Sequence, residues 1–234
     1  MSTVAIVPAR GGSKGIPRKN LRVVAGRTLV GWAVHAGLEA ATVTDVVVSS
    51  DDPEILEEGR RQGALPLLRP SALATDSAST DAVLLHALGA LGWRHEIVVL
   101  LQPTVPARRP GLVDECVQRL IATGSDSLLT GRRLGFVWRR HGLAIRRPRA
   151  GRWEQTNCRE RARRQDFRIE DRRFEEDGAV FVSRSSLLAD TGCRLGGKVE
   201  LFENRRTVDV DDFDDLEFAE YLLTRCGKLF SETA

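Results

Sequence analysis

Short apolar runs alternate with amphipathic segments through roughly the first half of the chain. The runs are rich in β-branched residues and lack the strict apolar–polar alternation of a strand with one wet face. Such runs are typical of parallel strands that are buried on both faces of a sheet. The pattern predicts strands at residues 4–7, 46–49, 65–68, 97–101, 127–129 and, after a break, 179–182.

Between these runs, apolar residues recur at helical spacing, first over residues 29–40. Asp52 followed by Pro53 is typical of an N-cap and a first-turn proline, and it predicts a helix that ends near Gly63. Further helices are expected at residues 83–91, at residues 112–121 and after Asp212. Alternating strands and helices predict an α/β fold, a doubly wound and mostly parallel sheet, with residues 1–234 in a single domain.

Residues 132–176 break this pattern. They are rich in arginine, contain Trp138 and Trp153, and show few apolar runs and no clear helical period. A structureless segment of this length is unusual inside a compact domain, so we expect it to pair with something. Arginines beside tryptophans also suit stacking on single-stranded RNA, which leaves an RNA-binding surface as an alternative.

The composition narrows the class of protein. Of 234 residues, 42% are hydrophobic, which suffices for a substantial core, and a net charge of +3 is small for a nucleic-acid-binding protein. The four cysteines, at positions 116, 158, 193 and 226, form no C-x-x-C pair, which favours free thiols in a reducing compartment. There is neither an apolar run of membrane-spanning length nor a signal-peptide pattern. We therefore expect a cytoplasmic protein that binds no membrane and no nucleic acid.

The strongest chemical signal follows the first apolar run. Residues 10–19 contain three glycines, at positions 11, 12 and 15, and four cations. Glycine lets backbone N–H groups approach a ligand closely, and cations neutralise phosphate oxygens. A P-loop requires Ser or Thr directly after its lysine, whereas Lys14 is followed by Gly15. The segment also lacks the G-x-G-x-x-G pattern of dinucleotide-binding proteins. The sequence thus predicts a phosphate-binding loop that is neither of these two kinds.

Residues 7–20, Val-Pro-Ala-Arg-Gly-Gly-Ser-Lys-Gly-Ile-Pro-Arg-Lys-Asn, resemble the opening motif of the acylneuraminate cytidylyltransferases. These are the CMP-N-acetylneuraminic acid (CMP-sialic acid) synthetases and their relatives acting on legionaminic, pseudaminic and similar nine-carbon acid sugars. Further motifs of that family recur in order at residues 49–52, 69–76 with Ser79, 100–104, 164–166, 197–198 and 208–211. The resemblance implies a Rossmann-like nucleotidyltransferase and a homodimer, with residues 132–176 as an inserted dimerisation subdomain. Its substrates would be CTP and an acidic sugar.

The resemblance also implies roles for individual residues. Arg10, Lys14 and Lys19 would be the catalytic residues, because they can stabilise the triphosphate and the leaving pyrophosphate. The nucleotide-binding residues would be Ala9, Arg10, Gly11, Gly12, Ser13, Lys14, Asn20, Arg69, Ser79 and Gln102. Asn20 and Ser79 have an alternative interpretation as a turn residue and a helix cap.

Asp209 and Asp211 are the expected ligands of a divalent cation, Mg²⁺. Residues at i and i+2 of an extended segment point to the same side, and Mg²⁺ prefers hard oxygen ligands. An alternative interpretation takes Asp211 together with Asp212, Asp214 and Asp215 as the acidic first turn of the last helix. The resemblance favours Asp209 and Asp211 as ligands, and the later three as capping or solvated residues.

For the acceptor sugar, we expect contacts from Gln102, Arg164 and Phe181. Arg164 is the candidate for binding the acceptor carboxylate, and its alternative interpretation is a solvated arginine in an arginine-rich run. This half of the chain departs from the family pattern. Asp177 stands where asparagine is usual, and Phe181 where tyrosine is usual. Phe181 lacks a hydroxyl group that could donate a hydrogen bond, and Asp177 would repel a sugar carboxylate that came close. The acceptor could therefore be another 2-keto acid sugar or an acidic antibiotic precursor, and a non-catalytic nucleotide-binding protein is a further alternative.

Overall fold

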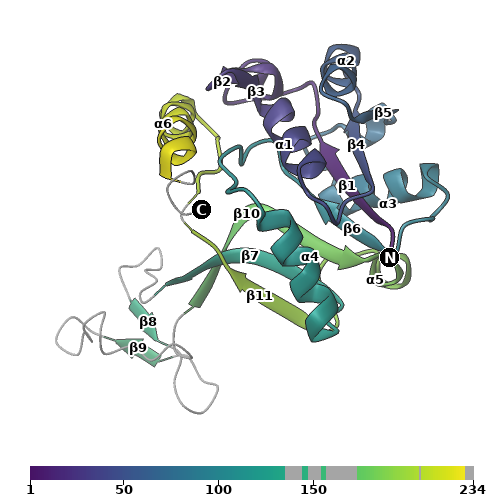
Figure 1. Cartoon of the computed structure of the whole chain (residues 1–234), viewed down its shortest axis with the longest axis vertical. Coiled ribbons are helices and arrows are strands. Elements are labelled where there is room, and N and C mark those ends of the chain that lie inside the picture. The colour runs from purple at the N-terminus through teal and green to yellow at the C-terminus, as the bar shows by residue number, and fades with distance from the viewer. Residues whose placement is uncertain (135–143, 147–153, 157–172, 206, 230–234) are drawn as a thin grey trace.

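The computed structural model describes residues 1–134, 144–146, 154–156, 173–205 and 207–229. Its main feature is a seven-stranded sheet in the spatial order β11-β7-β10-β6-β1-β4-β5 (Figure 1). These strands are β1 (Thr3–Pro8), β4 (Asp45–Ser50), β5 (Leu65–Leu68), β6 (Ile97–Leu100), β7 (Ser127–Leu134), β10 (Arg173–Arg184) and β11 (Val199–Glu203). All neighbours are parallel except that β10 is antiparallel to both β6 and β7. The expected α/β fold with a mostly parallel sheet is confirmed.

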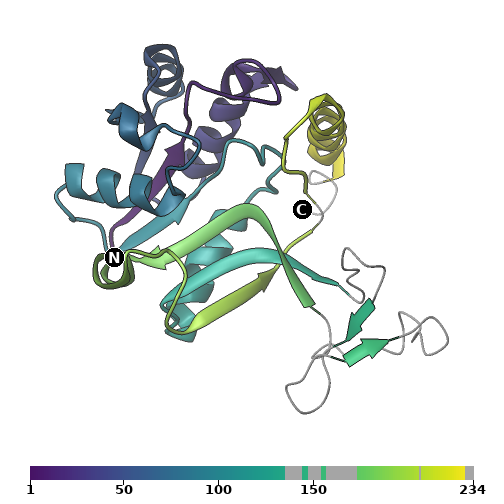
Figure 2. The same cartoon turned by 180° about the vertical axis from the view of Figure 1, so that it is seen from behind.

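Helices cover both faces of this sheet. They are α1 (Leu29–Leu38), α2 (Pro53–Arg61), α3 (Thr80–Ala90), α4 (Leu112–Thr123) and α5 (Ser185–Thr191), whereas α6 (Phe213–Leu229) stands apart from the sheet (Figure 1) and packs in a separate apolar cluster with Ile16 and Val24. In β1, Ala5 and Val7 pack in one core cluster with α1, α2 and α4, whereas Val4 and Ile6 pack in another with α3 and α5. Accordingly, α4 lies in front of the sheet in Figure 1 and behind it in Figure 2. Burial on both faces explains why the central strands have continuous apolar runs.

Two short pairs of strands stand outside the main sheet. They are β2 (Val23–Val24) with β3 (Arg27–Thr28), and β8 (Ala144–Arg146) with β9 (Glu154–Thr156). Short 3₁₀ helices occupy Lys19–Leu21 and Ser71–Leu73. Among the described residues, no helix combines the length and apolar character needed to cross a membrane.

The sheet extends into both ends of the arginine-rich segment. Strands β7 and β10 pair Arg133 with Phe174 and Arg132 with Glu175, and Arg132 Nε donates to Glu175 Oε2 at 2.7 Å. The charged pair Arg132–Glu175 joins the two strands here. Because charged residues interrupt the apolar pattern, the sequence predicts only the inner part of each strand. The remainder of the expected dimerisation segment, with Trp138 and Trp153, lies outside the described residues apart from the β8–β9 pair.

Adding a methyl group at Gly59 in α2 should destabilise the fold, because its Cβ would lie 2.7 Å from Val48 Cγ2 in β4. We expect Gly59→Ala to lower the free energy of unfolding by about 1–3 kcal/mol, since overpacking outweighs the gain in helix propensity. Gly89→Ala is the matched control in α3, where the nearest atom would be 4.0 Å away. We expect Gly89→Ala to raise the free energy of unfolding by about 0.5–1 kcal/mol, as measured by chemical denaturation. A change of the same sign in the free energy of unfolding for both variants would contradict this packing argument.

Candidate functional site

A cleft of about 390 Å³ opens at the carboxyl ends of β1 and β6. The strand order reverses between these two strands, because the chain runs from β1 outward to β4 and β5 and then returns to β6 on the other side. Ligands of open α/β sheets bind at such a switch point. The structure brings eight predicted site residues to the walls of this cleft: Arg10, Ser13, Lys14, Lys19, Asn20, Arg69, Gln102 and Asp211.

The glycine-rich loop after β1 is anchored to the end of β4 and to the residue that follows it. Ala9 N donates to Ser49 O at 3.0 Å, and Gly11 N donates to Asp51 Oδ1 at 3.1 Å. Within the loop, Asn20 Nδ2 donates to the carbonyl oxygen of Arg10 at 2.9 Å. Asn20 therefore lines the cleft and also has the turn-stabilising role that the sequence left open.

The same loop packs against the segment before α6. Gly15 lies so close to this segment that a Cβ atom would overlap the carbonyl oxygen of Asp211. Lys19 Nζ donates to Val210 O at 2.6 Å and to Asp211 Oδ1 at 3.1 Å. Below these contacts, Ile16 is buried in a small apolar cluster with Val208 and Val210. The position of this loop therefore depends on residues nearly two hundred positions away in the sequence.

Arg10 and Lys14 share one carboxylate across the mouth of the cleft. Arg10 Nη1 and Lys14 Nζ each lie 2.6 Å from an oxygen of Asp76. Hydrogen bonds from Lys14 and then Arg10 hold the pKa of Asp76 below its ordinary value, so this carboxylate stays charged near neutral pH. Asp76 belongs to a motif that carried the resemblance, but nothing in the sequence indicated that it pairs with these cations.

Arg69 supplies a buried cation at the back of the cleft. Its side chain is only 4% exposed, and its Nη2 lies 3.8 Å from Asp51 Oδ1. Burial lowers the pKa of Arg69, and the charge of Asp51 opposes that shift. Its Nε is buried without a hydrogen-bond partner in the described part of the chain. A buried donor in this state is costly, and a ligand carbonyl or phosphate oxygen would satisfy it.

Four other predicted nucleotide-binding residues lie outside the walls of the cleft. Ala9, Gly11 and Gly12 belong to the loop that forms its edge, and Ser79 precedes α3. The Oγ atom of Ser79 accepts a hydrogen bond from Ala82 N at 3.1 Å, so it caps this helix. The structural alternative for Ser79 is therefore confirmed.

The acidic segment before α6 divides into two groups. Asp209 and Asp211 alternate with the buried Val208 and Val210, so both carboxylates are on the exposed side, and Asp211 lines the cleft whereas Asp209 does not. Asp215 Oδ2 accepts from Asp212 N at 3.3 Å and Asp212 Oδ1 accepts from Asp215 N at 3.0 Å, which is a reciprocal capping box. These two aspartates are thus helix caps, as one interpretation of the sequence held.

The predicted acceptor residues are distributed differently. Gln102 lines the cleft, whereas Phe181 is 2% exposed in the core below α3, with the guanidinium of Arg194 4.9 Å from its ring. Arg164 lies outside the described residues. Asp177 is not among the residues that line the cleft. Its carboxylate accepts hydrogen bonds from Thr130 Oγ1, Ala179 N and Asn204 Nδ2.

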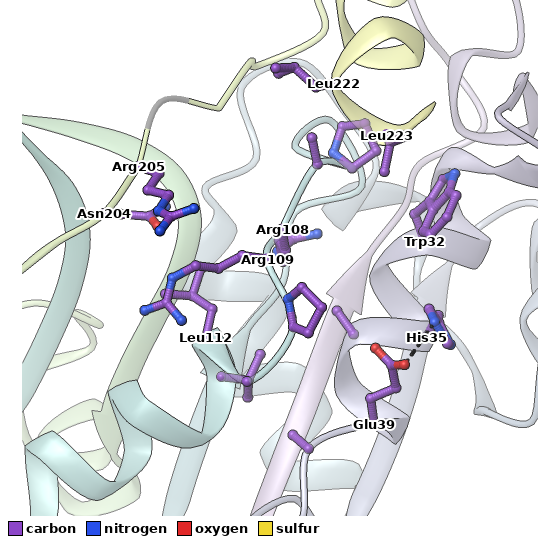
Figure 3. Close-up of a pocket in the computed structure, with 17 residues that line it drawn as sticks. Trp32, His35, Glu39, Arg108, Arg109, Leu112, Asn204, Arg205, Leu222 and Leu223 are labelled. Atoms are coloured by element: carbon purple, nitrogen blue, oxygen red, sulfur yellow. Dashed lines mark ion pairs between the residues drawn. The ribbon is translucent and has the colours of Figure 1, made fainter. Parts of the chain in front are cut away.

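A second cavity, of about 460 Å³, lies between α1, the start of α4 and α6 (Figure 3). Trp32, Leu222 and Leu223 form an apolar side, and Arg109, Asn204 and Arg205 lie on the opposite side. It contains neither the glycine-rich loop nor any predicted site residue. The smaller cleft, which combines that loop with several cations, is therefore the candidate active site.

A cationic glycine-rich loop at the switch point of a doubly wound sheet defines an α/β protein that binds a phosphate-rich ligand, the class that includes nucleotidyltransferases. A cytidylyltransferase family model matches residues 4–137. This match covers more than half of the chain, so the protein belongs to the cytidylyltransferase family and is a nucleotidyltransferase.

Individual relatives extend this likeness over nearly the whole chain. The pseudaminic acid cytidylyltransferase of Campylobacter jejuni is 28% identical over 95% of this chain and 96% of its own length. The N-acylneuraminate cytidylyltransferase A of Danio rerio is 30% identical over 95% of this chain, which spans about half (51%) of that longer protein. A solved CMP:2-keto-3-deoxy-manno-octonic acid synthetase complexed with CTP has the same fold, with a TM-score of 0.71 and 18% identity over 96% of this chain and 99% of that one.

The close approach of the loop to Asp211 can be tested with two glycines of one loop. Gly15→Ala should push the loop away from Asp211 and weaken CTP binding by roughly 10- to 100-fold, because a small misplacement disrupts oriented contacts. Gly12→Ala adds the same methyl group where no atom lies within 4 Å, and we expect a much smaller effect. Isothermal titration calorimetry would measure both, with thermal unfolding as the check on folding. Equal losses for the two variants would contradict this account.

Asp76 should compete with the triphosphate for Arg10 and Lys14. We expect Asp76→Asn to tighten CTP binding by roughly two- to fivefold at low ionic strength, the range of an exposed ion pair. The difference should shrink as salt screens these charges. Glu57→Gln is the control, because it removes the same charge from an exposed pair with Arg60 on α2. Weaker CTP binding by Asp76→Asn would show that the carboxylate assists the ligand instead.

Proposed function

We propose that this cytidylyltransferase transfers CMP from CTP to the anomeric hydroxyl of an acidic, nine-carbon sugar of the sialic acid type, with release of pyrophosphate. The observation that carries the proposal is the cleft at the switch point, where Arg10, Lys14, Lys19 and the buried Arg69 surround one ligand-sized space. The likeness to the pseudaminic acid and N-acylneuraminate enzymes over 95% of the chain supports the choice of acceptor class.

The reaction requires little covalent chemistry from the protein. The anomeric oxygen attacks the α-phosphorus of CTP in line, the bond from this phosphorus to the bridging oxygen of pyrophosphate breaks, and the hydroxyl proton leaves to solvent or to a phosphate oxygen. Negative charge builds up on the leaving pyrophosphate. Arg10, Lys14 and Lys19 hold and stabilise that charge, and the amides of the glycine-rich loop orient the phosphates.

A divalent cation, Mg²⁺, belongs to the same proposal. When bound, it would neutralise phosphate charge and orient the α-phosphoryl group. Among the described residues, no group of three or more His, Cys, Asp or Glu side chains converges on one point. Mg²⁺ keeps several waters and phosphate oxygens and needs only one or two carboxylates. Asp211 lines the cleft and would be a ligand once Lys19 releases its contact with it. Asp209, on the same exposed side of the segment but outside the cleft walls, would be the second ligand.

We also propose that the protein is a cytoplasmic homodimer. Free cysteines at Cys116 and Cys193 are consistent with a reducing compartment. The β8–β9 pair, which stands apart from the main sheet in Figure 1, belongs to the segment proposed for the subunit contact. Sedimentation analysis of the full-length chain would test the dimer, and a monomer at micromolar concentration would contradict it.

The function is tested by measuring pyrophosphate release from CTP and Mg²⁺ with a panel of acceptors. The panel contains pseudaminic, legionaminic and N-acetylneuraminic acids, together with other 2-keto acid sugars. We expect release with at least one nine-carbon acid, and a preference for CTP over ATP and GTP. Tight CTP binding without turnover of any acceptor would favour a non-catalytic nucleotide-binding protein. Preference for ATP or GTP would contradict the proposal.

The proposed metal site is tested by a single amide substitution. Asp211→Asn should lower turnover by at least roughly 100-fold, because it removes a charged oxygen ligand at the cleft. Asp214→Asn is the control, since this exposed residue in the first turn of α6 does not line the cleft. Thermal unfolding should be similar for both variants. Near-normal activity of Asp211→Asn across a Mg²⁺ titration would exclude this assignment.

A further inference from the structure

Arg108 connects the loop after β6 to the neighbouring strand β10, although it does not line the cleft. Its Nε donates to the carbonyl oxygen of Ala179, and its Nη2 donates to the carbonyl oxygen of Gln102, each at 2.6 Å. The third nitrogen, Nη1, is buried and has no hydrogen-bond partner within the described ranges. One planar guanidinium therefore joins the backbone of Gln102, which lines the cleft, to the backbone of β10 at Ala179.

The part of β10 that Arg108 contacts, residues 177–180, departs from regular strand pairing and is called the bulge below. The register with β7 shifts between Glu176 and Phe181, and Gly178 has a φ of +69°. A Cβ atom at Gly178 would lie 2.7 Å from Oε1 of Gln102, so the side-chain amide of Gln102 lies directly against the bulge. Bulges occur where a strand must redirect a side chain near a site.

The interior of the bulge is filled by a network of polar groups. Oδ1 of Asp177 accepts from Thr130 Oγ1 at 2.6 Å and from Ala179 N at 2.9 Å, while its Oδ2 accepts from Asn204 Nδ2 at 2.8 Å. Three donors onto two oxygens suit an ionised carboxylate. This network gives the surface against which Gln102 rests a fixed shape.

Two negative charges accompany the guanidinium. Burial lowers the pKa of Arg108 to about 9, and the charges of Asp177 and Asp209 oppose that shift, so the side chain is still a cation near neutral pH. The loop that ends at Arg108 is also joined to the segment of Asp209, because Val210 N donates to Thr104 O at 2.7 Å. The cation therefore interacts with Asp177 of β10 and with Asp209, a proposed metal ligand.

We propose that Arg108 is a positioning residue for the transfer reaction, which fixes Gln102 at the cleft by joining its backbone to the bulge in β10. This inference rests on the proposed function, because Gln102 is a predicted contact of both nucleotide and acceptor. Arginine suits the task better than lysine, because its planar group donates in two directions at once.

Arg109 provides an internal comparison. Its guanidinium pairs with Glu115 on α4, and Figure 3 shows it directed to the side of the second cavity where Asn204 and Arg205 lie. No hydrogen bond from Arg109 to the cleft loop or to β10 occurs in the described residues. The two arginines are adjacent in sequence and have the same charge, but only Arg108 contacts the backbone of Gln102.

The decisive experiment is a double-mutant cycle between Arg108 and Gln102 in the full-length chain. We expect Arg108→Met to lower kcat/KM for the acceptor by roughly 10- to 100-fold. In a Gln102→Ala background, the same change should cost no more than about twofold, because Arg108 acts through Gln102. Arg108→Lys should recover part of the activity, since an ammonium reaches one of the two carbonyls. Arg109→Met should match the wild-type protein.

Equal losses from Arg108→Met in both backgrounds would overturn the proposal, since a purely structural role adds independently of Gln102. Wild-type activity of Gln102→Ala, or equal losses from the Arg108 and Arg109 variants, would overturn it as well. Should Arg108→Met fail to fold, Arg108→Lys takes its place in the cycle, because it keeps the buried charge.

A second measurement does not depend on turnover. Hydrogen exchange of the Val105 amide, which donates to Gln102 O at 3.2 Å, should accelerate severalfold in Arg108→Lys and stay unchanged in Arg109→Met. Unchanged exchange in Arg108→Lys would overturn the positioning role even in a protein that transfers no nucleotide. Absence of CTP-dependent turnover in the wild type, with the expected exchange pattern, would instead contradict the proposed function alone.

Discussion

The active-site cleft depends on one contact between the two ends of the sequence, the packing of the glycine-rich loop against the segment before α6. Lys19 reaches across to the carbonyl oxygen of Val210 at 2.6 Å, and Ile16 is buried beside Val208 and Val210. Val210 is in turn hydrogen-bonded to Thr104 in the loop after β6. Three loops that are distant in sequence therefore contact one another around the cleft.

This arrangement explains why glycine is needed at one particular place. The loop could carry its cations on many backbones, but only a residue without a Cβ can approach the carbonyl of Asp211 so closely. The approach places Lys19 and Asp211 on the same wall as Arg10 and Lys14. Cations and a carboxylate therefore line one small space, as the proposal of a triphosphate with a hard metal ion requires.

The sequence predicts the central sheet well, because strands such as β1 and β6 are buried on both faces and their apolar runs have no other simple explanation. It also predicts eight of the residues that line the cleft, since the loop and its motifs carry a chemical pattern. It could not predict the outer part of β7 and β10, where Arg132 and Glu175 pair across strands and hide the strand period. Nor could it predict the pairing of Asp76 with Arg10 and Lys14, which depends on the fold alone.

Asp177, which stands where the family usually has asparagine, shows that the effect of a motif departure depends on the contacts that the residue makes in the fold. From the sequence, Asp177 is expected to repel an acidic sugar that comes close. In the structure its carboxylate is turned into the β-bulge, where it accepts from Thr130, Ala179 and Asn204 and its charge favours the cationic form of Arg108. A carboxylate at this position therefore stabilises the part of β10 against which the side chain of Gln102 lies. Its charge is opposed by that of Arg108, and it does not line the cleft, so this departure places no unpaired negative charge on the cleft walls.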